Sequence, residues 1–235
     1  MLRLHDHRTG RAEALPAGRG LRIQVTGGAA GASGGVGGRP PSNGTGGGYR
    51  RAVVADLLRR VAERAGRHVQ VMSTGVSAKG LDDYNIQPFQ DASTPDADVY
   101  VSGAADMDAL CLVVPQETGG WASSDALAAR LAMLEVPYRE PLELSPVRLS
   151  SAKERLDVWR GKVAEWATSP GRPMNRAYAA EAEAALADDL DSPAALAVLD
   201  RLAADPDVPP GAKLETFIHL DLVLALGLVS AIGGV

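Results

Sequence analysis

The sequence is poor in cysteine and in net positive charge, and each shortage excludes a kind of site. Cys111 is the only cysteine, which excludes an intrachain disulfide and a thiolate-rich zinc site. Such cysteine usage fits a reducing compartment, so we expect a cytoplasmic protein. The formal net charge is −5, whereas a surface that neutralises nucleic-acid phosphates is normally basic. A tRNA partner is therefore disfavoured.

The sequence also lacks a long uninterrupted apolar run. Residues 1–20 carry charges throughout, and the apolar stretch 220–235 is interrupted by Asp221, Gly227, Ser230 and Gly233. A membrane-spanning helix needs about 20 predominantly apolar residues. We expect neither a signal peptide nor a membrane span.

Two nucleotide-binding signatures are incomplete. Residues 26–33 read TGGAAGAS after a strand, which resembles the glycine fingerprint of short-chain dehydrogenases. Ser33 stands in place of the last glycine and no tyrosine has a lysine four residues on, so nicotinamide binding is disfavoured. The loop contains no Gly-Lys-Ser/Thr, which excludes a P-loop.

What is present begins as a strand, a glycine-rich loop, a helix and a second strand. Residues 21–26 alternate as in a strand, 49–65 have helical periodicity, and 68–72 form a short apolar strand. About half of residues 27–48 are glycine, and this composition buries too little apolar surface to offset its ordering entropy. We predict a flexible loop there. The order indicates a βαβ unit of the nucleotide-binding type.

The rest of the chain changes from strands to helices. A polar, aperiodic segment at 73–95 precedes two further expected strands, at 98–102 and 110–114. Ser145-Pro146 and Ser192-Pro193 are typical helix starts, with a serine N-cap followed by proline. We expect about five helices, beginning at residue 123 and including 145–167, 173–190, 192–204 and 211–229.

These elements predict an α/β fold with two domains. The first, 1–122, is a reduced Rossmann-like nucleotide-binding domain that contains the flexible loop. The second, 123–235, is a helical bundle.

The charged clusters have ordinary structural explanations. Six arginines lie at the helical spacing of a solvated helix face, namely Arg50, Arg51, Arg59, Arg60, Arg64 and Arg67. The four histidines are too scattered for a local metal motif and are expected at the surface or at caps. Asp188, Asp189 and Asp191 precede the helix start at Ser192, where negative charge is favourable.

Three segments of the helical half resemble the cysteinyl-tRNA synthetases. They are RLAMLEVPYR at 130–139, PLELS at 141–145 and ADDLDSPAAL at 187–196. The last is especially similar to the mycothiol cysteine ligases, which join cysteine to an amino sugar. Residues 4–27 and 49–60 resemble the opening of the same family. The resemblance implies a class I synthetase-type fold, shortened here.

The resemblance also places the family's functional motifs on this chain. The His-x-Gly-His motif, which stabilises the ATP phosphates, falls on Thr45, Gly46, Gly47 and Gly48. A zinc-binding cysteine of the family falls on Thr26. We therefore predict no catalytic residue and no metal ligand: zinc is not expected, and the resemblance leaves ATP binding in doubt.

A further motif of the family, Lys-Met-Ser-Lys-Ser, is absent. Residues 119–123 occupy about its place without a lysine. Losing one preorganised donor at a charged transition state costs about 10² to 10³ in rate, so losing several together disfavours ordinary adenylation.

Three functions remain open. The first is a catalytically degenerate paralogue that binds a protein or small-molecule partner and serves as an accessory in a bacterial biosynthetic pathway. The second is a divergent ATP-dependent ligase, for which Arg50, Arg51 and Lys79 are the nearby cationic candidates; without zinc, cysteine would not be its substrate. The third is an RNA-binding remnant, which the acidic balance disfavours.

Overall fold

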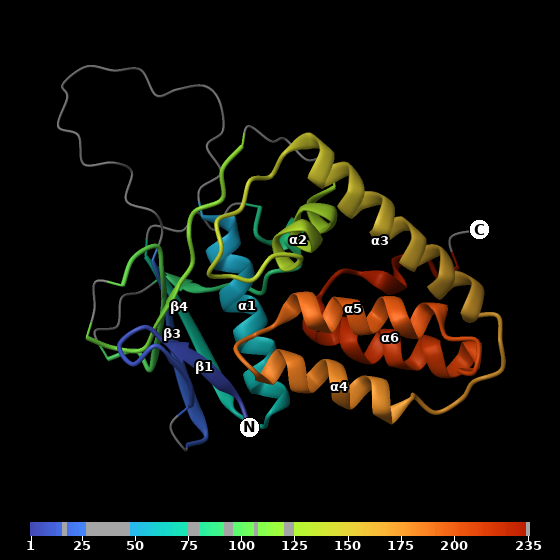
Figure 1. Cartoon of the computed structure of the whole chain (residues 1–235), viewed down its shortest axis with the longest axis horizontal. Coiled ribbons are helices and arrows are strands. Elements are labelled where there is room, and N and C mark those ends of the chain that lie inside the picture. The colour runs from blue at the N-terminus through green and yellow to red at the C-terminus, as the bar shows by residue number, and fades with distance from the viewer. Residues whose placement is uncertain are drawn as a thin grey trace.

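The architecture is a parallel sheet and a group of helices on opposite sides of one central helix, α1 (Figure 1). Thr45, Gly46, Gly47 and Lys79 lie outside the described residues, as does nearly all of the predicted flexible loop. The computed structural model describes residues 1–15, 18–26, 48–74, 80–91, 96–105, 108–119 and 125–233.

The sheet has five parallel strands in the order β5-β4-β3-β6-β7 within the described ranges. The strands are β3 (Gly20–Thr26), β4 (His68–Thr74), β5 (Gln90–Asp91), β6 (Val99–Ser102) and β7 (Cys111–Val113). In the centre, Ile23 of β3 lies opposite Val71 of β4 and Val99 of β6. α1 (Tyr49–Arg64) connects β3 to β4, which confirms the predicted βαβ unit.

An N-terminal hairpin and one short strand were not predicted from the sequence. β1 (Arg3–Asp6) and β2 (Arg11–Ala14) form an antiparallel hairpin in the charged N-terminal segment. Its local signal is weak because Leu4 is the one fully buried side chain of the two strands. The second is β5, a two-residue strand in the segment expected to be aperiodic.

The second half of the chain is helical, as predicted. Its helices are α2 (Ala126–Leu134), α3 (Pro146–Trp166), α4 (Arg176–Ala187), α5 (Ser192–Ala204) and α6 (Pro210–Leu224). Among the described residues, short 3₁₀ turns occur at η1 (Asp82–Tyr84), in the first half of the chain, and at η2 (Leu228–Ala231), after α6. A parallel sheet with flanking helices followed by a helical region confirms the predicted fold class, and it is consistent with a class I synthetase-type fold.

Side-chain caps explain where two of the helices, α3 and α5, begin. The Ser145 side chain accepts a hydrogen bond from Arg148 N (3.3 Å) at the start of α3, as expected. The expected cap at Ser192 is wrong: Asp191 caps α5 by accepting from Ala194 N (3.0 Å). The Ser192 hydroxyl instead donates to the carbonyl of Leu134 (2.8 Å).

The last helix ends five residues before the predicted Val229. Ala225 adopts a left-handed conformation with φ 56° directly after α6. The partly buried Asp221 carboxylate accepts from Leu226 N (2.7 Å) and Leu228 N (2.8 Å), which holds this turn. The sequence pattern missed the turn because the residues after it, up to Val229, remain largely apolar.

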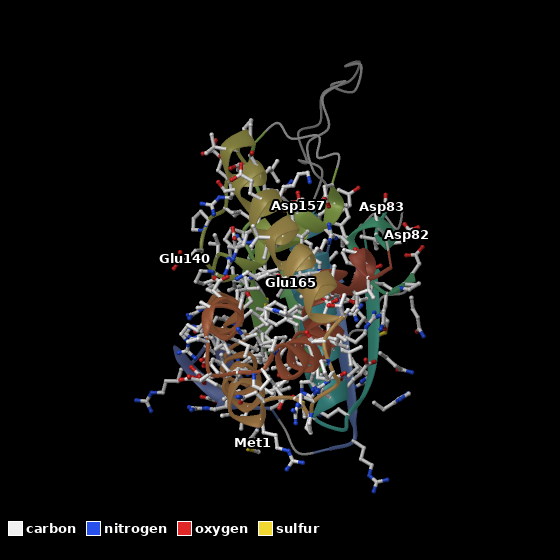
Figure 2. All side chains as sticks on the ribbon, turned by 90° about the vertical axis from the view of Figure 1, so that its right-hand side faces the viewer. Met1, Asp82, Asp83, Glu140, Asp157 and Glu165 are labelled. Carbon is white, nitrogen blue, oxygen red and sulfur yellow. The ribbon has the colours of Figure 1, made fainter. Side chains whose placement is uncertain are left out.

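The buried apolar side chains form one cluster that includes residues of the sheet, α1 and every helix of the second half. In the helical half, Phe217 packs edge-on against Trp159 and Trp166, with ring centroids 6.2 and 5.1 Å apart. The outer surface carries charged side chains such as Asp82 and Asp157 (Figure 2). The predicted domain boundary at 122/123 falls outside the described residues, so the division stays a prediction.

Within the described ranges, each helix is too short or too polar to traverse a bilayer.

Candidate functional site

The candidate site lies at the carboxyl ends of β3 and β6, next to the start of α1. The chain leaves β3 through α1 towards β4 on one side, whereas β6 joins β3 on the other side. In open α/β sheets, ligands bind at such a reversal point, outside the carboxyl ends of the strands. The start of α1 adds a helix N-terminus, which attracts anions. Both features are expected of a nucleotide-binding fold.

The guanidinium group of Arg51 fills part of this reversal point. Its Nη1 donates to the carbonyl of Thr26 at the end of β3 (3.3 Å), and its Nε donates to the carbonyl of Val114 after β7 (3.1 Å). Arg51 is 5 % exposed. A Cβ on Gly103, directly after β6, would lie 2.9 Å from Cζ of Arg51. Arg51 therefore links the carboxyl ends of the strands and packs against backbone that has no side chain.

Arg50 is held in a similar way on the other side of α1. Its Nη1 donates to the carbonyl of Glu140, and its Nη2 donates to the carbonyl of Pro137 (2.9 Å). Burial lowers the pKa of Arg50 to about 10. The prediction of a solvated arginine face is wrong for Arg50, Arg51 and Arg59, which are buried. Backbone carbonyls from distant segments stabilise these cations inside the protein.

The N-terminus of α1 is occupied by the side chain of Glu117. Oε1 of Glu117 accepts a hydrogen bond from the Tyr49 backbone N–H (3.0 Å). The preceding residue, Gly48, is left-handed (φ 79°) and provides no side-chain cap. Burial raises the pKa of Glu117, although nearby backbone N–H groups and Arg51 oppose that rise. A carboxylate of the protein thus sits where such folds present N–H groups to an external anion.

Glu117 reaches this position through short strand-like pairing after β7. The next residue, Thr118, donates its backbone N–H to Leu142 O (2.9 Å) and accepts from Leu144 N (2.9 Å). Glu117 was not predicted as a site residue from the sequence. It lies 68 residues from Tyr49 in the chain, and nothing local marks its carboxylate as a helix cap.

The residues at the expected zinc position do not fit a zinc site. Thr26 has a neutral hydroxyl in place of a thiolate, and this hydroxyl donates to the carbonyl of Val101 (3.4 Å). Cys111 is buried on β7, with its Sγ directed at the carbonyl of Ala104 (3.6 Å). Across the described ranges, no three or more His, Cys, Asp or Glu residues are grouped so that they could hold a metal ion.

The segments that resemble the synthetases meet at Asp189. The Tyr138 hydroxyl donates to Asp189 Oδ1 (2.6 Å), and Arg139 Nη2 lies 3.1 Å from Asp189 Oδ2. The backbone N–H of His5, on β1, donates to the same carboxylate (2.7 Å). The Asp189 carboxylate, before α5, therefore links the N-terminal hairpin to the helical half. Its hydrogen bonds and ion pair with protein groups explain its position without a metal ion.

Comparison with known proteins identifies the relatives of this chain. It is 48% identical over 80 residues to the L-cysteine:1D-myo-inositol 2-amino-2-deoxy-alpha-D-glucopyranoside ligase of Streptomyces griseus. Identity with the ligase of the same name from Xylanimonas cellulosilytica is 41% over 95 residues. It is also 41% over 90 residues with the cysteine–tRNA ligase of Parvibaculum lavamentivorans. Part of the chain is therefore similar in sequence to cysteine ligases.

The relationship to the cysteine ligases is partial in extent. The three alignments cover 34 to 40% of this chain and 19 to 23% of the relatives. No family model matches the chain. These alignments confirm the resemblance that was inferred from the sequence. An alignment with about a fifth of a ligase does not show that this chain has the activity of the complete enzyme.

Proposed function

We propose that this cysteine-ligase relative has lost adenylation chemistry and acts by binding a protein or small-molecule partner, as an accessory in a bacterial biosynthetic pathway. The observation that carries the proposal is the Glu117 carboxylate at the N-terminus of α1. A phosphate bound at this position would not receive the Tyr49 backbone N–H, because Glu117 already accepts it. The phosphate would also lie beside the buried Glu117 carboxylate, which repels it. Both effects oppose ATP binding.

The two described cationic candidates support the same proposal. Arg50 and Arg51 are buried, and each donates two or more hydrogen bonds to backbone carbonyls. Redirecting either guanidinium to a phosphate would leave buried carbonyl groups without these donors, which costs about 1 to 3 kcal/mol per group. Zinc is not expected, because Thr26 offers no thiolate. A tRNA partner stays disfavoured by the net charge of −5.

The test is ATP–pyrophosphate exchange by the purified chain with each of the twenty amino acids, alongside calorimetric titration with ATP. We expect no exchange above the enzyme-free background and no saturable heat. A complete cysteine ligase assayed in parallel verifies the assay.

The rival outcome is a divergent ATP-dependent amino-acid-activating enzyme. Exchange with any amino acid that is lost in Arg51→Met and retained in Arg176→Met would establish it. Arg176 is an exposed arginine of α4 and serves as the matched control.

A further inference from the structure

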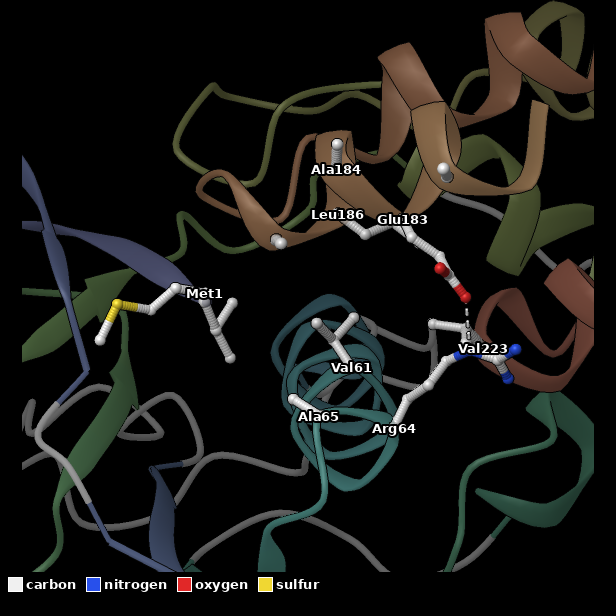
Figure 3. A pocket seen from close by; sticks show the side chains of 11 residues that line it. Met1, Val61, Arg64, Ala65, Glu183, Ala184, Leu186 and Val223 are labelled. Carbon is white, nitrogen blue, oxygen red and sulfur yellow. Dashed lines mark hydrogen bonds and ion pairs between the residues drawn. The ribbon is translucent and has the colours of Figure 1, made fainter. Parts of the chain in front are cut away.

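A groove separates the end of α1 from α4, away from the carboxyl edge of the sheet (Figure 3). Its volume is about 580 Å³, within the range of roughly 300 to 1,000 Å³ typical of small-molecule sites. Val61 of α1 and Ala65, directly after it, line one wall, and Ala184 and Leu186 of α4 line the other. Met1 lies towards one end of the groove, and Arg64 lies towards the other (Figure 3). The walls are thus mainly aliphatic.

Arg64 and Glu183 carry the two charged side chains among the described lining residues, and they pair with each other. Arg64 Nε donates to Glu183 Oε1 (2.7 Å), an interaction drawn in Figure 3. His219 of α6 contacts both members of the pair. Its Nε2 lies 2.8 Å from Glu183 Oε1, and its ring nitrogens lie within hydrogen-bond distance of Arg64 Nη2. This Arg64–Glu183 pair offers both a donor and an acceptor at one end of an apolar groove.

The charge of the pair limits which head group it can accept. Partial burial alone would raise the pKa of Glu183, but the hydrogen bonds from Arg64 and His219 outweigh it and lower that pKa. Glu183 is therefore ionised at neutral pH and balances the charge of Arg64. At the Arg64 end of the groove, a charged head group would be partly desolvated against aliphatic walls, and the lining offers it no unpaired charged side chain, which is unfavourable. An uncharged group that both donates and accepts would keep the balance.

We propose that this groove binds an uncharged, mainly aliphatic small molecule whose single amide or hydroxyl group hydrogen-bonds to the Arg64–Glu183 pair. The groove shares no residue with the carboxyl edge of the sheet. The proposal therefore stands or falls separately from the loss of adenylation.

The test uses three probes with the same chain length and different head groups: octanamide, octanoate and octylamine. Binding to the full chain is followed by ligand-observed NMR titration at pH 7.5. For a ligand of this size we expect octanamide to saturate with a dissociation constant on the order of 1 mM. The two charged probes should bind about tenfold more weakly. No saturation by octanamide up to on the order of 10 mM, or tighter binding of octanoate, would overturn the proposal.

Two variants locate the binding. Ala65→Leu fills the groove from an exposed position directly after α1, so it should abolish octanamide binding without unfolding the protein. Ala177→Leu, at an exposed position of α4 that does not line the groove, should bind as the parent does. Thermal unfolding of both variants verifies that they fold. Unchanged octanamide binding in a folded Ala65→Leu variant would contradict the proposed location.

Glu183→Gln tests the role of the charge balance. This change leaves the Arg64 charge without its carboxylate, so the preference should reverse and octanoate should bind about tenfold more tightly than octanamide. If the folded variant keeps the parent's preference for octanamide, the Arg64–Glu183 pair does not select the head group and the proposal is wrong.

Discussion

Arg130 Nη2 donates to Asp56 Oδ2 across 2.9 Å, and both side chains are fully buried. Asp56 lies on α1 and Arg130 on α2, so this ion pair joins the sheet-flanking helix to the helical half. The remaining Arg130 donors reach the carbonyls of Leu224 (2.8 Å) and Tyr84 (2.9 Å). One arginine therefore fixes the ends of η1 and α6 against α1.

We expect Asp56→Asn to destabilise the fold strongly, because it leaves the buried Arg130 without its carboxylate. Removing one partner of a buried pair costs about 3 to 5 kcal/mol. The matched control is Asp157→Asn, which breaks an exposed pair with Lys153 and should cost less than about 1 kcal/mol. Urea unfolding at pH 7 measures both. Equal, small losses would show that the buried pair contributes no more than the exposed one.

Leu199 is fully buried on α5, and Leu199→Ala should lower the melting temperature sharply. A buried Leu to Ala change costs about 2 to 5 kcal/mol, because the cavity it leaves cannot fully collapse. Leu222, on α6, is 62% exposed, and Leu222→Ala should change stability by less than about 0.5 kcal/mol. Thermal unfolding of the two variants compares them directly. A neutral Leu199→Ala would mean that α5 does not carry core packing.

Gly103→Ala should destabilise the carboxyl edge of the sheet, because its new Cβ would collide with the Arg51 guanidinium. Arg51 would have to leave the carbonyls of Thr26 and Val114, and overpacking of this kind costs about 1 to 3 kcal/mol. Combining Gly103→Ala with Arg51→Met removes the collision. The double variant should lose less stability than the sum of the two single changes. Simple additivity in urea unfolding would contradict the contact.

Glu117 should make the protein less stable as the pH rises above the ordinary carboxyl range. Burial raises the pKa of Glu117 in the folded protein, so the folded state holds this proton more tightly than the unfolded chain does. Stability then falls between the unfolded and the folded pKa, and the full cost is present above the folded pKa. Glu117→Gln removes this dependence and keeps an acceptor for Tyr49 N–H.

The measurement is the free energy of unfolding of Glu117→Gln and the parent from pH 4.5 to 7.5. We expect the variant to gain stability relative to the parent as the pH rises. A difference that is constant with pH would show that Glu117 does not titrate in this window.

The sequence alone predicted the elements whose signals are local. The apolar spacing of 49–65 and the serine before Pro146 predicted α1 and the start of α3 within one residue. The strands predicted at 21–26 and 68–72 correspond to β3 and β4, because the apolar pattern of a strand is visible in consecutive residues. The family resemblance also followed from consecutive residues.

The candidate site could not be predicted in the same way. Placing β6 beside β3, and Glu117 at the start of α1, depends on pairings between segments tens of residues apart. No periodicity encodes such pairings. The sequence indicated the helix that carries most of these arginines, but the predicted solvated face was wrong for Arg50, Arg51 and Arg59, because the spacing does not show which cations find partners inside the protein.

The sequence by itself thus determined the central βαβ unit, the helices that follow, the resemblance to cysteine ligases and the mismatch of Thr26 with a zinc ligand. The tertiary structure decided that Arg50 and Arg51 are buried and that Glu117 occupies the helix N-terminus. The physical reason is that a charged side chain enters the interior only where distant backbone supplies hydrogen bonds or opposite charge. Those partners exist only once the sheet, α1 and the helical half have packed together.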